Sequence, residues 1–237
     1  MKDESSIKNV FKGMSIYKLI ILFAIFAIFG TYFEMVQNMI RHFLADGSFY
    51  WSVRKSTIYG PFSAIYGLGG VFFIVLLGRK ERPWYMTVLY GALAGGIFEY
   101  SLGYLQELIT GNISWDYSNK FLNIHGRTTI PYMLIWGLFA FAIVKIAYPF
   151  LSKWIEKIPD KIGRIAAPAL GIFLIVDMLI SFGAIYRQNE RRNCIEPTNN
   201  LSVLFDKAYP DDVLKKHFPN IRPPKGTENI CCLNRNS

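Results

Sequence analysis

The chain has 237 residues, of which 52% are hydrophobic, 16% aromatic and only 18% charged, and its formal net charge is +9. Soluble domains carry about 25% charged residues, so this composition argues against a disordered chain, a collagen-like chain and a nucleic-acid-binding protein. The basic residues lie between long apolar runs, where membrane proteins keep the cations that orient them. Composition and pattern together predict an all-α, polytopic integral membrane helix bundle whose surroundings are a lipid bilayer.

Five apolar runs approach the roughly 20 residues that a membrane-spanning helix needs. We expect spans at about residues 19–40, 59–78, 84–108, 130–150 and 165–186. The first run follows a basic flank, as a signal peptide does, but it is long and no small-residue cleavage site follows it. We therefore predict that this run is a retained first helix.

These spans define a predicted transmembrane domain of residues 1–186 and a polar tail of residues 187–237. Within the tail, residues 200–220 carry several apolar side chains, which predict one short helix that packs on the bundle or on the membrane surface. Asp211 or Asp212 is expected to cap that helix, because aspartate is a preferred N-cap residue.

All three cysteines lie in the tail, at Cys194, Cys231 and Cys232. We interpret them as incidental. The alternative is one disulfide in a tail outside the cell, which leaves one thiol over.

Lysine and arginine counts in short loops orient a membrane protein. Lysines precede the first run, and residues 79–82 and 152–164 are also basic, so these three segments share one side if there are five spans. The bias predicts a multi-pass protein of the cell membrane with a cytoplasmic N-terminus. Three arginines directly after the last run argue against the resulting outside tail: Arg187, Arg191 and Arg192.

Ionisable side chains inside a span are costly and indicate function by default. Glu34, Glu99 and Asp177 lie within expected spans, and Glu107 ends the third. One face of the third span carries residues spaced by four: Gly91, Gly95, Glu99, Gly103 and Glu107. Small residues at this spacing let another helix approach closely, so we interpret the glycines as packing residues. Glu99 is either a structural carboxyl group or a functional acid.

Two tyrosines of the second span, Tyr59 and Tyr66, lie seven residues apart and therefore nearly on one face. Tyr59 is expected in the aromatic belt at the membrane surface. Tyr66 lies deeper, and its buried hydroxyl needs a partner. A carboxylate from the first or third span is the natural candidate.

The segment between the third and fourth spans carries polar residues in the order Ser114-Trp115-Asp116-Tyr117-Ser118, Asn123, His125 and Arg127. Asp116 and His125 could form a base and its orienting partner, or weakly ligate a metal together with a glutamate from a span. Arg127 could hold a phosphate or pair with a carboxylate. The alternative is an ordered re-entrant loop, with Asp116 and Asn123 in turn hydrogen bonds and Arg127 neutralising a buried glutamate.

Several nucleotide and catalytic motifs are missing from the sequence: the phosphate loop, the dinucleotide fingerprint, H-E-x-x-H and G-x-S-x-G. We therefore predict no cofactor and no resident metal. Any use of ATP requires a separate ATP-binding subunit.

An ordered set of residues resembles a known family: Glu34, Tyr59–Phe62, Ile65–Gly67, Glu99-Tyr100, Glu107, Trp115–Ser118, Asn123 and Gly126-Arg127. Over about residues 19–150 the chain resembles the bacterial ABC-transporter type IV permeases, also called CmpB-like membrane proteins. The last predicted span and Phe218-Pro219-Asn220 are similar to longer members. The resemblance implies an all-helical membrane permease and supplies no substrate.

Three functions fit these features. We favour a permease-like transport component over an enzyme; it requires a cavity that reaches the midplane near Asp177 and Glu99. The alternative is a membrane enzyme or carrier that acts on a lipid or isoprenoid at the outer face, from a pocket confined to that face. The third is a scaffold with a closed interior. The candidate substrate- or ion-binding residues are Glu34, Tyr59, Tyr66, Glu99, Glu107, Asp116, Tyr117, Asn123, Arg127 and Asp177. Five of them are expected to form one functional cluster, with Tyr59 and Tyr66 as hydroxyl partners: Glu34, Glu99, Asp116, Asn123 and Arg127.

The partners expected for a permease are an ATP-binding subunit and a second copy of the chain. A docking site for the ATP-binding subunit could lie in the basic segment 152–164, but we favour the alternative, in which this segment is an ordinary amphipathic stretch at the membrane surface. Trp154, Ile155 and Ile158 would supply the apolar contacts of such a docking site.

Overall fold

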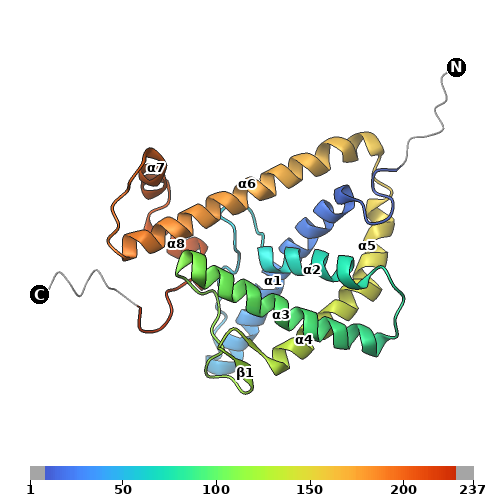
Figure 1. Cartoon of the computed structure of the whole chain (residues 1–237), viewed down its shortest axis with the longest axis horizontal. Helices are drawn as coiled ribbons and strands as arrows, with labels where there is room; N and C mark the ends of the chain where they lie inside the picture. The colour runs from blue at the N-terminus through green and yellow to red at the C-terminus, as the bar shows by residue number, and fades with distance from the viewer. Residues whose placement is uncertain (1–8, 228–237) are drawn as a thin grey trace, which may run out of the picture.

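The computed structural model describes residues 9–227, which form a helix bundle with one short hairpin (Figure 1). The helices are α1 (Ile16–Asp46), α2 (Ala64–Leu77), α3 (Trp84–Thr110), α4 (Ile130–Phe141), the π-helix η1 (Ala142–Ala147), α5 (Tyr148–Ile155), α6 (Asp160–Arg192), α7 (Asn200–Ala208) and α8 (Asp211–His217). Strands β1 (Asn123–Ile124) and β2 (Thr128–Thr129) pair antiparallel between α3 and α4. The predicted all-α class is confirmed. The expectations for Cys231 and Cys232 fall outside the described residues.

Three helical stretches of the described chain are long and apolar enough to cross a membrane: α1, the continuous α4–η1–α5 (Ile130–Ile155) and α6. The third predicted span, α3, has 27 residues but is not among them. Helix α2 has only 14 residues, or about 21 Å at 1.5 Å per residue, which is short of the ~30 Å hydrocarbon core of a bilayer. The predicted count of five spans is therefore only partly supported.

The second predicted span begins too early, because residues 59–63 are not helical. Gly60 has φ +74°, in the left-handed region, and Pro61 has no N–H to donate. The irregular segment is tied down instead by Ser56 Oγ, which accepts from the amide of Ala64 at 2.6 Å. The backbone N–H of Ser63 donates to the carbonyl of Ala27 on α1 at 3.0 Å.

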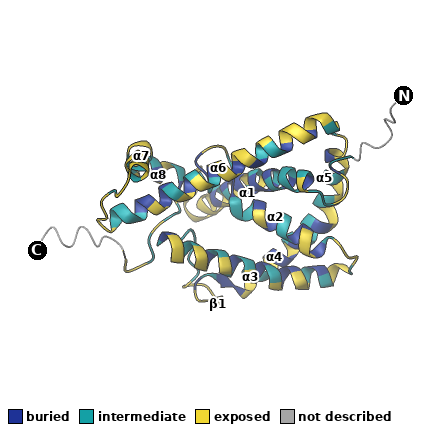
Figure 2. Ribbon diagram, turned by 45° about the horizontal axis from the view of Figure 1, so that its top comes forward, coloured by how far each residue is buried: buried dark blue, intermediate teal, exposed yellow. Residues whose placement is uncertain are grey.

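The exposed side chains of the long helices are largely apolar, and Figure 2 shows exposed residues along the length of these helices. On α6, Ile172 is 64% exposed and Leu179 is 65% exposed, and on α3 Ile97 is 68% exposed. Soluble monomers rarely expose apolar patches of this extent. These faces suit a lipid environment.

Close approach of α3 and α4 depends on the glycine face predicted in the third span. A Cβ added to Gly95 would lie 2.4 Å from Trp136 Cβ, and one added to Gly91 would lie 2.4 Å from Ala140 Cβ. A Cβ added to Gly137 would lie 2.4 Å from the carbonyl oxygen of Val88. The packing interpretation of these glycines is confirmed.

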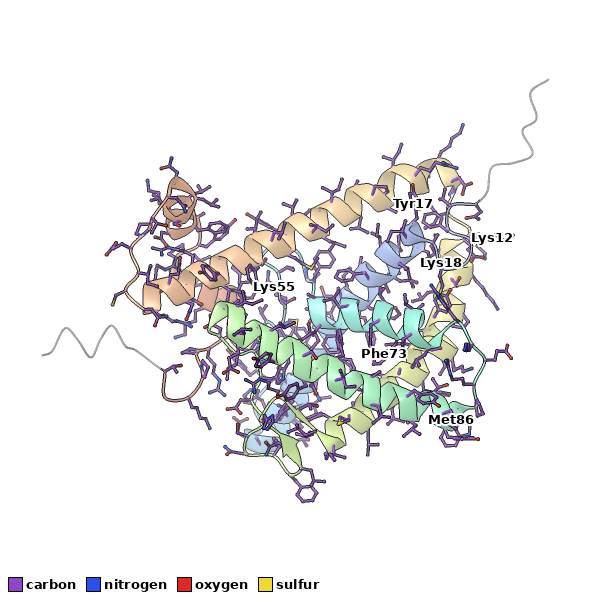
Figure 3. The ribbon with its side chains drawn as sticks, in the orientation of Figure 1. Lys12, Tyr17, Lys18, Lys55, Phe73 and Met86 are labelled. Atoms are coloured by element: carbon purple, nitrogen blue, oxygen red, sulfur yellow. The ribbon has the colours of Figure 1, made fainter. Side chains whose placement is uncertain are left out.

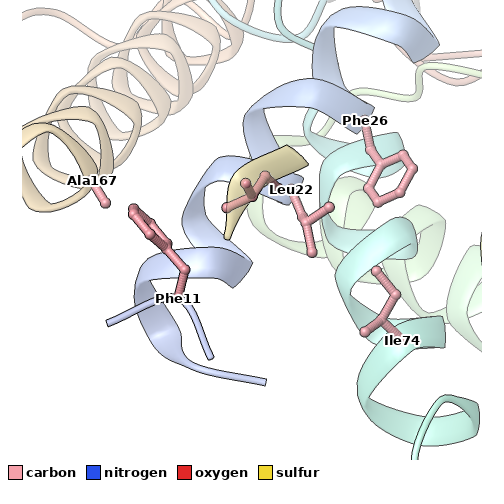
Figure 4. Close-up of a cluster of buried hydrophobic side chains, with 6 residues drawn as sticks. Phe11, Leu22, Phe26, Ile74 and Ala167 are labelled. Atoms are coloured by element: carbon pink, nitrogen blue, oxygen red, sulfur yellow. The ribbon is translucent and has the colours of Figure 1, made fainter. Parts of the chain in front are cut away.

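A buried apolar cluster closes the end of the bundle that holds the start of α1 (Figure 4). Phe11 and Leu22 are fully buried there against Ile74 of α2 and Ala167 of α6. Ile155 is 4% exposed in the same cluster.

The burial of Ile155 corrects the docking site considered for segment 152–164. Ile155 belongs to the core, and Ile158 packs partly buried against it, because the N-terminal segment folds over both residues. Of the three apolar residues expected to contact a partner, only Trp154 is exposed, at 59%.

Lys18 lies on the first turn of α1 and is fully buried (Figure 3). Its Nζ donates to Ser152 Oγ at 2.6 Å and forms an ion pair with Glu156. The hydrogen bond from Lys18 holds the pKa of the Glu156 carboxyl below its ordinary value. This contact fastens the start of α1 to the α5–α6 corner.

The tail forms two short helices where one was predicted. Asn199 caps α7, whereas α8 follows Pro210 without a side-chain cap, so the capping role expected of Asp211 or Asp212 is wrong. Both aspartates lie in the first turn of α8. At this position a carboxylate is stabilised by the positive end of the helix dipole.

The tail packs on α6, which agrees with the expectation of a helix on the bundle. Arg187 binds both oxygens of Asp206 through Nε and Nη2, each at 2.9 Å. Leu214 and Phe218 are buried against Ala184 and Ile185. This bidentate ion pair between Arg187 and Asp206 fixes the orientation of α7 on α6 and also attracts the two helices by charge.

Candidate functional site

A cavity of about 980 Å³ lies among five helices, the α3–α4 loop and the tail. Its helical lining comes from 33–41 of α1, 64–68 of α2, 99–110 of α3, 132–139 of the α4 stretch and 178–185 of α6. All five stretches lie in the half of the bundle that faces the α3–α4 loop and the tail. The cavity therefore occupies one half of the bundle, and we call it the vestibule.

Glu34 and Tyr66 lie on the lining of the vestibule. Tyr66 Oη donates to Glu34 Oε1 at 3.2 Å, so the carboxylate partner expected for Tyr66 is present and comes from the first span. Gly30 makes room for this contact, because a Cβ there would lie 2.1 Å from Tyr66 Cγ.

Glu99 also lines the vestibule, and it is 5% exposed. Its Oε2 accepts from Thr128 Oγ1 at 2.6 Å, and its Oε1 accepts from Tyr117 Oη at 3.2 Å. The ring of Tyr117 stacks on Tyr132 with centroids 4.7 Å apart. Burial raises the pKa of Tyr117, so this phenol stays protonated and remains a donor at physiological pH.

Several cations line the vestibule as well: Arg41, Arg54, Lys55, Lys120 and Arg222. Lys55 Nζ donates to the carbonyl of Ile58 at 2.7 Å, and burial lowers the pKa of its ammonium group. When the side-chain amide of Asn38 is flipped, its oxygen accepts hydrogen bonds from the Arg54 guanidinium. Site prediction missed these cations, although Arg41, Arg54 and Lys55 stand between the first two predicted spans.

Asp116 lies on the vestibule lining near the tail. Its Oδ1 accepts from the Ser118 amide at 2.9 Å and from Ser118 Oγ at 2.6 Å, and Arg222 lies 3.5 Å from its Oδ2. These Ser118 hydrogen bonds lower the pKa of Asp116. The carboxylate is therefore ionised and already partnered.

Comparison with known protein families shows to which family the chain belongs. The profile of the family described as "Putative ABC-transporter type IV" matches residues 21–182, which is more than half of the chain. The chain belongs to this family. No curated protein and no solved structure matches it.

The site residues predicted from the sequence do not all reach the vestibule. Glu34, Tyr66, Glu99, Asp116 and Tyr117 line it, whereas five other candidates are absent from its lining: Tyr59, Glu107, Asn123, Arg127 and Asp177. The single cluster expected from the sequence is thus divided.

The Asp116–His125 pair expected as a base and its orienting partner does not form. His125 Nδ1 lies 2.9 Å from Tyr100 Oη instead. His125 has φ +50° beside Gly126 at φ +69°, and this turn carries its ring to α3. Within residues 9–227, no group of three or more His, Cys, Asp or Glu side chains is placed to hold a metal ion.

Arg127 and Asn123 hold the α3–α4 loop together. Arg127 Nη2 pairs with Glu107 Oε2 at 2.5 Å, and its guanidinium lies over the ring of Tyr104. Asn123 Nδ2 donates to the carbonyls of Ser118 and Lys120 at 3.1 and 3.0 Å. The partner of Arg127 is Glu107, at the end of α3, and not a glutamate buried within a span.

Asp177 fastens the segment before α2 to α6. It is 1% exposed, and its Oδ1 accepts from the Tyr59 amide at 3.0 Å. Ser181, one turn further along α6, accepts from the Ile58 amide at 2.8 Å. Tyr59 Oη lies 2.9 Å from Tyr209 Oη, so this tyrosine contacts the tail.

Proposed function

We propose that this chain is the permease-like, membrane-embedded component of a transport system, and that the vestibule is its substrate site. The observation that carries the proposal is the placement of two carboxylates, Glu34 and Glu99, on one cavity between apolar helices. Ionisable groups are expensive inside a membrane, and they commonly mark substrate or ion pathways. Membership of an ABC-transporter family supports transport as the general role.

The vestibule occupies one half of the bundle, as it would in a transporter open toward one surface, and the pocket of a lipid enzyme or carrier would lie in the same half. The vestibule reaches Glu99, which a transport pathway requires, but Asp177 is not on its lining. With a cytoplasmic N-terminus, as we propose, the vestibule opens outward, because α1 begins at the opposite end. Movement that opens the other half would complete alternating access.

The energy source in this proposal is a separate ATP-binding subunit. We place its contact at the α5–α6 corner, where Trp154 is exposed and Lys157 Nζ lies 4.5 Å from the centre of its ring. Tryptophan is one of the residue types enriched among the side chains that contribute most to binding at protein interfaces.

Gentle affinity purification from the native membrane, followed by mass spectrometry, tests the proposal. We expect a stoichiometric subunit that binds and hydrolyses ATP. Trp154→Glu is expected to abolish its recovery, whereas Trp51→Glu, an exposed tryptophan beyond the other end of α1, keeps it. A homo-oligomer with one bound lipid or isoprenoid species and no ATPase would contradict the proposal and favour the lipid enzyme or carrier.

A further inference from the structure

One wall of the vestibule differs chemically from the rest. It consists of apolar residues of α3 and α6: Leu102, Leu105, Ile109, Met178, Leu179 and Phe182. All six line the cavity, and four of them have substantially exposed side chains: Leu105 (46%), Ile109 (48%), Leu179 (65%) and Phe182 (42%). This exposure is what a sideways opening of the vestibule between α3 and α6 would produce. In a bilayer this opening faces lipid chains.

The polar part of the vestibule holds more cations than nearby free carboxylates. Arg41, Arg54 and Lys55 form no ion pair within 4.0 Å among the described residues, although Glu34 interacts electrostatically with both arginines and Asp177 with Lys55. The other lining carboxylates are engaged elsewhere, because both oxygens of Glu99 accept hydrogen bonds and Asp116 is held by Ser118 and Arg222. Guanidinium groups bind phosphate oxygens through paired hydrogen bonds.

The two features together define a site for an amphiphile. We propose that the vestibule binds a membrane lipid with an anionic phosphate headgroup, which enters between α3 and α6. Its phosphate contacts Arg41, Arg54 and Lys55, and its chains remain at the apolar wall. This inference rests on the proposed function, because it names the substrate class of the same site. Free phosphate shares the headgroup chemistry, but it would gain nothing from a sideways apolar opening.

The test is photolabelling of the full-length protein in phosphatidylcholine nanodiscs. The probe is phosphatidylglycerol with a diazirine in its acyl chain, and labelled peptides are mapped by mass spectrometry. We expect adducts to concentrate at residues 102–109 and 178–182 and to fall when unlabelled phosphatidylglycerol is added. Arg54→Gln should reduce them by about tenfold or more, the effect of losing one charge-assisted hydrogen bond. Arg79→Gln, an exposed cation at the other end of the bundle, should leave them unchanged.

The sideways opening has its own matched pair of variants. Leu105→Trp narrows the opening and should remove the labelling, whereas Leu93→Trp, on an exposed part of α3 outside the vestibule, should not. Equal labelling around residue 93 and residues 102–109, or full labelling of Arg54→Gln, would overturn the inference. Loss of the adducts on addition of inorganic phosphate alone would assign the site to a free anion and overturn the lipid source.

The two proposals fail separately. Recovery of an ATP-binding subunit without specific lipid labelling would overturn only the lipid inference. Specific labelling without an ATP-binding subunit would keep the lipid site and overturn the ATP-driven permease.

Discussion

Thr128 donates a 2.6 Å hydrogen bond to Glu99, which joins the β2 strand of the α3–α4 loop to the middle of α3. Both side chains are buried, with 2% and 5% exposure. Tyr117 from the same loop donates to the other carboxylate oxygen. Glu99 therefore holds the loop that lines the vestibule, in addition to facing the vestibule itself.

Glu99→Gln is expected to preserve expression and impair function. The amide N–H2 faces a hydroxyl that donated to the carboxylate, so that hydroxyl must rotate to accept, and hydrogen bonds to a charged group become neutral ones, at a cost of about 1 kcal/mol. The thermal unfolding midpoint in detergent should fall, and in the Thr128→Val background the change should be smaller. Glu81→Gln, in the loop before α3, is the neutral control. A fully active Glu99→Gln protein would contradict an ionised role for this carboxylate.

The contact between Lys18 and Glu156 predicts unequal effects of removing its two partners. Glu156→Ala leaves a fully buried ammonium with Ser152 as its remaining acceptor, and should cost about 2 kcal/mol, less than the ~3–5 of a wholly buried pair. Lys18→Met leaves a carboxylate that is already 40% exposed, so its cost should be well under that of Glu156→Ala. Thermal unfolding of both variants measures the difference, and equal losses would contradict the burial of Lys18.

The same contact predicts a pH dependence. Because the hydrogen bond from Lys18 lowers the pKa of Glu156 below its ordinary value of 4.5, the unfolded chain binds the proton more readily. The contribution of Glu156 to stability is complete above about pH 4.5 and is lost as the pH falls through the lowered pKa that this carboxyl has in the folded protein. Unfolding midpoints measured from pH 6 down to pH 3, a range chosen to bracket that value, should fall less steeply in Lys18→Met than in the native chain. Parallel curves would show that Glu156 does not contribute.

Close packing of α3 on α4 predicts a difference between two glycines of one helix. Gly95→Ala forces a Cβ to 2.4 Å from Trp136 Cβ, and overpacking of this kind costs about 1–3 kcal/mol. Gly103→Ala meets only Trp115 Cζ2 at 3.2 Å, and the better helix propensity of alanine offsets that contact. Thermal unfolding should therefore separate the two variants. An unchanged Gly95→Ala protein would contradict the packing.

The features that lie on helices could be predicted from the sequence. Spacing by four placed Gly91 and Gly95 on the face that meets α4, and the depth of Tyr66 in its span pointed to a carboxylate partner. Both depend on helical periodicity, which is fixed by the backbone.

The contacts made by side chains of the α3–α4 loop could not be predicted from the sequence, because the direction of a side chain in a loop depends on individual backbone angles. Leu122 and His125 both have positive φ, an uncommon conformation for residues other than glycine. That turn sends His125 to Tyr100 and Arg127 to Glu107, away from the expected cluster. The cations of the vestibule were missed for a related reason: Arg41, Arg54 and Lys55 served as orientation markers, and their convergence depends on the irregular segment before α2.

Thiol labelling from each side of the membrane tests the central claim, a vestibule that opens from one surface. Gln37→Cys and Gln106→Cys place thiols on two different helices of the lining, and Glu81→Cys places one in the loop at the opposite end. The variants are treated with a membrane-impermeant maleimide in sealed vesicles of each orientation, and labelled peptides are identified by mass spectrometry. The account predicts that positions 37 and 106 react from one side only, the outside, and that position 81 reacts from the other. Labelling of positions 37 and 106 from opposite sides, or of neither, would contradict it.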